Sequence, residues 1–94
     1  MSPRRDLTGW IVRSAAGRDR GGLLCVVGVD GERLLLADGK RRKLARPKAK
    51  QLAHVELLSG RFDRPAIQKL RQGIPLTDKE LRTTLSAFRD EMEA

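Results

Sequence analysis

The densest cluster of positive charge in this chain lies in residues 40–50, KRRKLARPKAK. Seven of these eleven residues are Lys or Arg, and none is acidic. Such a run repels itself unless an anion neutralises it, and a polynucleotide backbone is the commonest anion with suitable spacing. Leu44 and Pro47 interrupt the run, which indicates a segment attached to a fold. We therefore predict phosphate binding by Lys40, Arg41, Arg42, Lys43, Arg46, Lys48 and Lys50.

A glycine-rich segment at residues 17–22, GRDRGG, is the second candidate site. Gly17 and Gly21 permit positive φ angles and a close approach of backbone amides to phosphate. Arg18 and Arg20 would then point outward. The plainer interpretation is a hairpin loop with solvated arginines, and spacing alone favours neither. The segment is not a Walker-type loop, because no Lys-Ser or Lys-Thr pair follows the glycines.

Few residues could support catalysis or hold a metal ion. Cys25 lies in an apolar stretch, where a free cysteine behaves as a small core residue and a buried thiol is inert. His54 is the only histidine, and only Glu56 lies at ligand spacing from it, so we expect no metal site. We accordingly expect no enzymatic activity, no cofactor and no small-molecule substrate.

Charge is distributed unevenly along the 94 residues, whose formal net charge is +8. Residues 1–76 carry 17 basic and 7 acidic side chains, a balance of +10, whereas residues 77–94 carry 3 and 5, a balance of −2. We expect the basic part to face RNA or another polyanion. A single cysteine allows no internal disulfide, and no apolar run approaches the ~20 residues that span a bilayer. These features predict a cytoplasmic protein without a membrane partner.

Between residues 10 and 58 the chain predicts short strands separated by turns. Asp30-Gly31 and Asp38-Gly39 predict tight hairpin turns of type I′, and Pro47 would break or border the basic strand. Trp10 is expected in the core. Closely spaced hairpins of this kind favour an antiparallel meander that curls into a small barrel. The expected strands are residues 10–12, 23–29, 33–37, 41–44 and 54–58.

The periodicity changes after residue 60, where two helices are predicted. Pro65 near the start and Gly73 just past the end define a short helix. Thr77 and Glu80 form a capping box that begins a longer one. Apolar residues then recur at helical spacing, and we expect this stripe to pack on the barrel, with a partner-binding face as the alternative. Its members are Leu81, Leu85, Phe88 and Met92.

The first segments of the chain resemble the KOW motif of large-subunit ribosomal proteins and NusG-type transcription factors. The resemblance is carried by Gly9 to Val12, by the Gly17 to Gly21 loop and by the apolar strand 23–29. The doubled glycine at positions 21 and 22 departs from the family, which often has a bulkier polar residue after the first glycine.

The following segments are similar to a group of small bacterial KOW proteins, usually described as RNA-binding and akin to KOW-bearing large-subunit ribosomal proteins of archaea and eukaryotes. The matching segments are Asp38 to Lys40, Pro47 to Lys50 and His54-Val55. The whole resemblance covers residues 7–58. It implies an SH3-like barrel that contacts RNA through the glycine loop and the basic strand.

These observations predict a mainly β protein: an SH3-like barrel of about five strands over residues 1–60, then one short and one longer helix over residues 61–94. The expected function is non-catalytic binding of structured, ribosomal RNA through its phosphates, since one Trp, two Phe and no Tyr are too few for the stacking platforms of other RNA-binding folds. The main alternative is a protein-interaction module of the transcription or translation machinery. It would dock through the barrel or through the acidic helix at Leu81, Leu85 and Phe88. DNA binding and a merely solubilising charged face also stay open, because charge does not separate the two nucleic acids.

Overall fold

The structure is a computed structural model that describes residues 6–17 and 20–94. Within these residues, five strands form one antiparallel sheet in the order β4-β3-β2-β1-β5, and two α-helices follow the last strand. The strands are β1 (Ile11–Ser14), β2 (Leu23–Asp30), β3 (Arg33–Ala37), β4 (Lys48–Gln51) and β5 (Val55–Ser59). A 3₁₀ helix, η1 (Leu52–His54), joins the last two strands, and the helices are α1 (Pro65–Gln72) and α2 (Asp78–Glu93).

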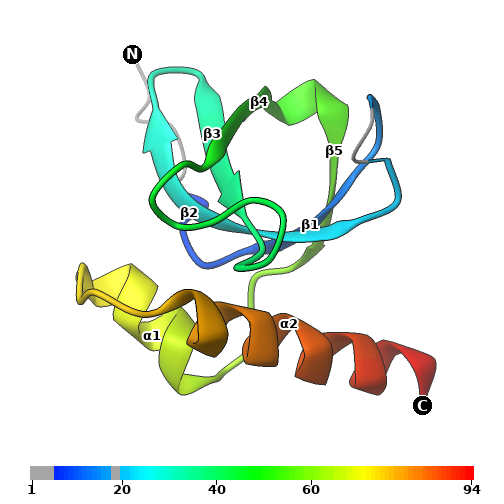
Figure 1. Ribbon diagram of the computed structural model, residues 1–94. Coiled ribbons are helices and arrows are strands. Elements are labelled where there is room, and N and C mark those ends of the chain that lie inside the picture. Colours follow the sequence, from blue (N-terminus) through cyan, green and yellow to red (C-terminus); the bar gives the residue numbers. More distant parts are fainter. Residues whose placement is uncertain (1–5, 18–19) are drawn as a thin grey trace.

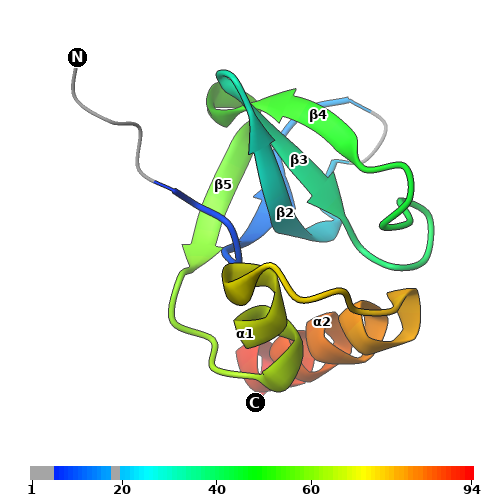
Figure 2. The ribbon, with the colours of Figure 1, turned by 90° about the vertical axis from the view of Figure 1, so that its left-hand side faces the viewer.

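The sheet curls so that its edge strands, β4 and β5, are joined through η1 at the open side of the curl (Figure 1). Both helices lie on one side of this curled sheet, as two perpendicular views show (Figures 1 and 2). The expected fold class is therefore confirmed: a small antiparallel β-barrel followed by a short and a longer helix. The helical segment also shares a core with the sheet, since Leu81 and Cys25 belong to one buried cluster.

Both faces of β2 are covered, which explains why its first seven residues carry no charge. Leu24 and Val26 lie in the cluster inside the curl, while Leu23 and Cys25 lie in the cluster between sheet and helices. Trp10, which was expected in the core, is only half-buried and packs against the inner cluster without belonging to it. The inner cluster also contains Leu7, Val12, Leu34 and Leu36, and the outer one contains Ile11, Ala37, Phe62, Ile67, Leu81, Leu85 and Phe88.

The helix boundaries follow the predicted signals. Pro65 is the first residue of α1, and Gly73 ends the helix in the left-handed conformation at a φ of 73°. The Thr77 hydroxyl accepts a hydrogen bond from the Glu80 amide, and the Glu80 carboxylate accepts one from the Thr77 amide. This capping box satisfies backbone groups that the first turn of α2 would otherwise leave unpaired.

The predicted basic strand at residues 41–44 is wrong, because these residues form a loop and β4 begins only at Lys48, after Pro47. The physical reason lies in Asp38. Its Oδ1 accepts hydrogen bonds from the amides of Lys40 and Arg42, each at 2.8 Å. A side chain that satisfies nearby amides in this way offers the backbone an alternative to a sheet ladder.

The two predicted type I′ turns also differ from the structure. Asp30 pairs with Arg33, so the β2–β3 loop consists of Gly31 and Glu32. Gly31 has a φ of 61°, and no non-glycine residue among those described has a positive φ. A positive φ at the first central residue alone is the pattern of a type II′ turn. Asp38-Gly39 opens the longer loop instead, and the final strand starts one residue late because His54 belongs to η1.

Candidate nucleic-acid interface

Residues 38–47, which we call the basic loop, are folded by hydrogen bonds within the loop. Besides the two amides bound by the Asp38 carboxylate, the Asp38 and Gly39 amides donate to the Arg42 carbonyl at 2.9 and 3.1 Å. The Arg46 amide donates to the Lys43 carbonyl at 2.9 Å. These bonds give the loop a defined backbone even though it carries a dense positive charge.

Helix α2 holds the basic loop from outside. A Cβ atom on Gly39 would lie 2.3 Å from the Asp78 carbonyl oxygen and 3.0 Å from the Arg82 amide nitrogen, so only glycine permits this approach. Arg82 Nη1 donates to the Gly39 carbonyl at 3.1 Å. The Leu44 amide donates to Asp78 Oδ1 at 2.7 Å, and the Leu44 side chain packs against the outer core. The loop is therefore fixed to the helix at two points along its length.

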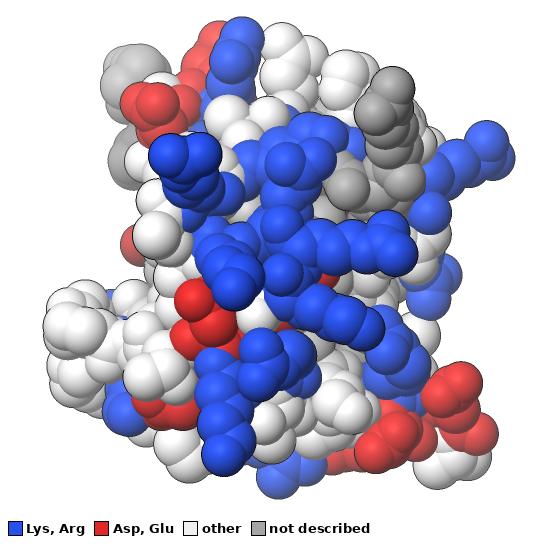
Figure 3. All heavy atoms as spheres, viewed as in Figure 1, with Lys and Arg blue, Asp and Glu red and all other residues white. Residues whose placement is uncertain are grey.

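Four cations of the basic loop project freely from this framework. Lys40, Arg41, Lys43 and Arg46 are exposed, and none of their side chains makes an ion pair or hydrogen bond with residues 6–17 or 20–94. Lys and Arg side chains gather at the centre of the face seen in Figure 3. Like charges held this close together favour the binding of a polyanion.

The glycine loop reaches the same region. The Gly21 amide donates to the Ser14 carbonyl at 2.8 Å, which closes the β1–β2 connection, and Gly17 and Gly21 have φ angles of 80° and 86°. Arg20 is exposed and lines a small hollow together with Arg41 and Arg42. Two segments that the sequence singled out separately thus meet in space. Arg18 lies outside the described residues.

Lys50 differs from the other predicted cations because it is buried, with 9% of its surface exposed. It pairs with Leu34 across the ladder, so its side chain lies on the inner face of the sheet. Its Nζ donates to Ser14 Oγ and to the Ala16 carbonyl, both at 2.6 Å. A buried charge needs such partners to offset its lost hydration. We therefore leave Lys50 out of the interface: it ties β4 to the end of β1, beside the glycine loop.

Lys48 also lies on this face, where it pairs with Leu36 and is half-buried. Arg42 is half-buried as well. Among the described residues, the exposed part of the predicted site therefore comprises two groups, while Lys48 and Arg42 are half-buried. The groups are Gly17, Arg20 and Gly21 of the glycine loop and Lys40, Arg41, Lys43 and Arg46 of the basic loop.

Sequence reasoning missed two arginines on α2. Arg82 and Arg89 are exposed and, with Lys40, line a hollow between the basic loop and the helix. Their spacing of seven places them on one helix face, with Ser86 between them. This periodicity was present in the sequence, but the net balance of −2 over residues 77–94 concealed it. A net charge describes a segment, whereas a helix presents different charges on different faces.

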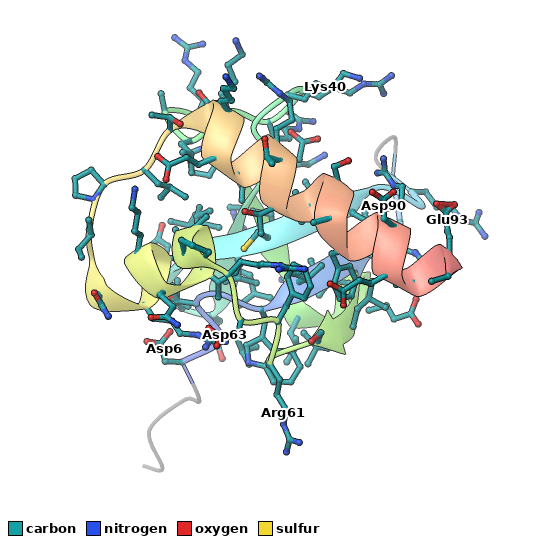
Figure 4. All side chains as sticks on the ribbon, turned by 90° about the horizontal axis from the view of Figure 1, so that it is seen from below. Asp6, Lys40, Arg61, Asp63, Asp90 and Glu93 are labelled. Carbon is teal, nitrogen blue, oxygen red and sulfur yellow. The ribbon has the colours of Figure 1, made fainter. Side chains whose placement is uncertain are left out.

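The acidic residues of α2 lie mainly elsewhere along the helix. Figure 4 shows Lys40 projecting from the loop beside α2, with Asp90 and Glu93 further along towards its C-terminal end. Asp6, Asp63 and Arg61 lie on the opposite side of the molecule in this view. The labelled carboxylates therefore lie away from Lys40 in this view.

Three of the four residues of the apolar stripe of α2 pack inward, which confirms the preferred prediction for them and not for Met92. Leu81, Leu85 and Phe88 are 0%, 5% and 8% exposed, whereas Met92 is 43% exposed. Phe88 meets Phe62 edge-on, with ring centroids 5.1 Å apart. Because Leu81, Leu85 and Phe88 form part of the outer core, they offer no exposed surface to a second protein in this structure.

The remaining candidate residues show no reactive arrangement. Burial raises the pKa of the Cys25 thiol to about 12, with Arg71 a weaker opposing influence, and His54 is exposed in η1. Within residues 6–17 and 20–94, no group of three or more His, Cys, Asp or Glu side chains could hold a metal ion. In the same residues, no helix combines the length and apolar character needed to cross a membrane.

Comparison of the chain with known protein families finds no matching family, and no curated protein matches it. The resemblance to KOW proteins therefore rests on the residues quoted above. A functional proposal has to be supported by the geometry of the basic loop, the glycine loop and the arginine face of α2.

Proposed function

We propose that this chain is a non-catalytic RNA-binding protein of the KOW class that contacts folded RNA mainly through phosphates. The KOW resemblance favours ribosomal RNA as the target, and the composition favours the cytoplasm as the location. The observation that carries the proposal is the fixed display of four exposed cations: Lys40, Arg41, Lys43 and Arg46 project from a loop that hydrogen bonds and α2 hold in place.

The ordering of the loop supports a binding role over a solubilising one. A solubilising charge needs only exposure to water, and a mobile tail would provide it. Here Asp38, Gly39 and Asp78 fix the backbone beneath the cations, so less conformational entropy is lost when an anion binds.

Phosphate contacts fit the exposed residues better than base stacking on Phe, Trp or Tyr side chains. Phe62 and Phe88 are buried in the outer core, and Trp10 packs at the rim of the inner cluster. No other Phe or Trp and no Tyr occurs in the chain, so a stacking platform of several such rings, as in single-strand binders, does not arise here. Recognition through shape and backbone is the mode that double-stranded RNA permits.

The test is a titration of fluorescent, folded RNA at two salt concentrations, about 50 and 200 mM. If about five phosphates are neutralised, affinity should fall by about a hundredfold or more across this range. Lys40→Gln should weaken binding and reduce the salt slope by about one. Arg61→Gln is the matched control, because it removes the same charge on the opposite side of the molecule (Figure 4).

Three results would contradict the proposal. Binding that resists salt would exclude a phosphate-dominated interface. Equal losses from Lys40→Gln and Arg61→Gln would show that net charge acts without a site. Equal affinity for folded RNA and duplex DNA would remove the preference for RNA, since charge alone does not distinguish the two.

A further inference from the structure

We infer that the hollow between the basic loop and α2 accepts a single unpaired nucleotide of the bound RNA. The inference rests on the proposed function and adds the feature of RNA that the site would select. The hollow, which we call the loop–helix hollow, has a volume of about 400 Å³, within the ~300–1,000 Å³ usual for ligand sites. Lys40 stands on its loop side, and Arg82 and Arg89 stand on its helix side.

The lining of the loop–helix hollow is mixed, which fits a nucleoside better than a bare phosphate. Leu23 and Leu85, which are 6% and 5% exposed, supply an apolar floor. Apolar surface favours the flat face of a base and contributes nothing to a phosphate. A guanidinium group can stack on a base or bind a phosphate through two parallel hydrogen bonds. Arg82 and Arg89 therefore suit both parts of a nucleotide.

An acidic residue in the same lining also favours a nucleoside over a bare phosphate. Asp38 lines the loop–helix hollow, and a carboxylate repels phosphate but accepts hydrogen bonds from N–H or O–H groups. Two of its lone-pair positions already bind the amides of Lys40 and Arg42, which fixes its orientation. A base N–H or a ribose 2′-hydroxyl is the complementary partner. The Ser86 hydroxyl, which also lines the hollow, can either donate or accept.

The two walls of the loop–helix hollow are locked to each other. Arg82 Nη1 binds the Gly39 carbonyl, and Gly39 lies against the first turn of α2. A rigid hollow admits a nucleotide only if that nucleotide leaves its stack. Extrusion costs a few kcal/mol for a paired base and least for one that is already unpaired. RNA with a bulged nucleotide should therefore bind more tightly than a fully paired stem.

The experiment compares two RNA hairpins, one fully paired and one with a single added, bulged 2-aminopurine nucleotide. A third hairpin, in which 2-aminopurine replaces a paired base in the stem, is the control for the probe. Wild-type protein should bind the bulged hairpin at least about tenfold more tightly than the fully paired hairpin. The 2-aminopurine fluorescence should change on binding when the probe is in the bulge, and stay constant when it replaces a paired base in the stem.

Ser86→Leu tests the hollow without changing any charge. Leucine fills space on this exposed helix face, favours helix, and cannot act as a stacking platform. The variant should bind the bulged hairpin only as tightly as the paired one, with affinity for the paired hairpin unchanged. Gln72→Leu is the control, because Gln72 is exposed at the end of α1 and does not line the hollow.

The outcomes separate this inference from the proposed function. Equal, salt-sensitive binding of both hairpins by wild type would overturn the inference and leave the proposed function standing. Equal weakening of both hairpins by Ser86→Leu, or a probe signal unaffected by binding, would also overturn it. Failure to bind either hairpin would overturn both.

Discussion

Gly39→Ala tests whether the cations must be held in place. Gly39 has a φ of 79°, and an added Cβ would meet the Asp78 carbonyl oxygen at 2.3 Å and the Arg82 amide at 3.0 Å. The loop would have to move away from α2. Gly31→Ala is the matched control, because Gly31 also has a positive φ of 61° and nothing lies within 4 Å of the added Cβ.

The expected effect can be worked out from these contacts. A positive φ costs alanine roughly 1–2 kcal/mol in either variant. Movement of the loop in Gly39→Ala also breaks the Leu44–Asp78 and Arg82–Gly39 hydrogen bonds. Each involves a charged group and contributes about 1.5 kcal/mol at the lower end of the usual range. Gly39→Ala should therefore destabilise the fold by about 3 kcal/mol more than Gly31→Ala.

Urea unfolding and thermal melting followed by circular dichroism measure this difference, which should lower Tm by roughly 12–24 °C relative to the control. Folded-RNA affinity, measured well below both transitions, should fall at least about tenfold for Gly39→Ala alone, because no charge is removed but the cations lose their support. Equal stability of the two variants would refute the packing account. Unchanged RNA affinity in a destabilised Gly39→Ala would show that a rigid loop is not required.

Three further predictions concern buried and paired groups. Lys50→Met leaves the partners of the ammonium unsatisfied and should lower the free energy of unfolding by about 2 kcal/mol or more. Lys43→Met removes the same charge from the surface and should leave Tm nearly unchanged. Equal effects of the two substitutions would contradict a bridging role for Lys50. Burial raises the pKa of the Cys25 thiol to about 12, so about one thiol in ten thousand is ionised at pH 8. A thiol reagent should therefore label the protein only after unfolding, and labelling of the native chain would disprove this. Hydrogen bonds from Lys69, then Thr77, lower the pKa of the Glu80 carboxyl. The stability that Glu80 contributes is therefore present above the pKa of its unfolded state and lost as pH falls through the pKa of its folded state. An NMR titration of Glu80 with a midpoint at or above the ordinary value would be inconsistent with these bonds.

The sequence predicted the elements whose signals are local. The charge-free run from Leu23 and the five-residue strand from Arg33 to Ala37 became β2 and β3, because apolar residues on both faces of a strand need burial. Thr77 and Glu80 specified the start of α2, since a capping box acts within one turn. These predictions need no knowledge of distant parts of the chain.

The parts that failed depend on contacts between distant segments. Residues 41–44 were predicted to form a strand, but the Asp38 carboxylate binds the amides of Lys40 and Arg42, and Asp78, far along the chain, binds the amide of Leu44. In the sequence, Lys50 cannot be distinguished from a surface cation, because only folding brings Ser14 within reach of its ammonium group. No propensity rule anticipates such partners, because tertiary contacts decide them.

The arginine face of α2 is an intermediate case. Arg82, Ser86 and Arg89 follow helical spacing that is visible in the sequence, so a face-by-face count would have found them. Their position opposite Lys40 was not predictable, because it depends on how Gly39 docks against the helix.

The most direct test of the central claim reverses charge on the basic loop. A triple variant, Lys40→Glu, Arg41→Glu and Lys43→Glu, is compared with a charge-matched control that reverses the exposed Arg33, Arg61 and Lys79 outside the loop. Fluorescence anisotropy with folded RNA measures the affinity of each. The account predicts a loss of about a thousandfold for the loop variant, roughly one decade for each of the three lost phosphate contacts, and a much smaller loss for the control. Equal losses in the two variants would contradict it.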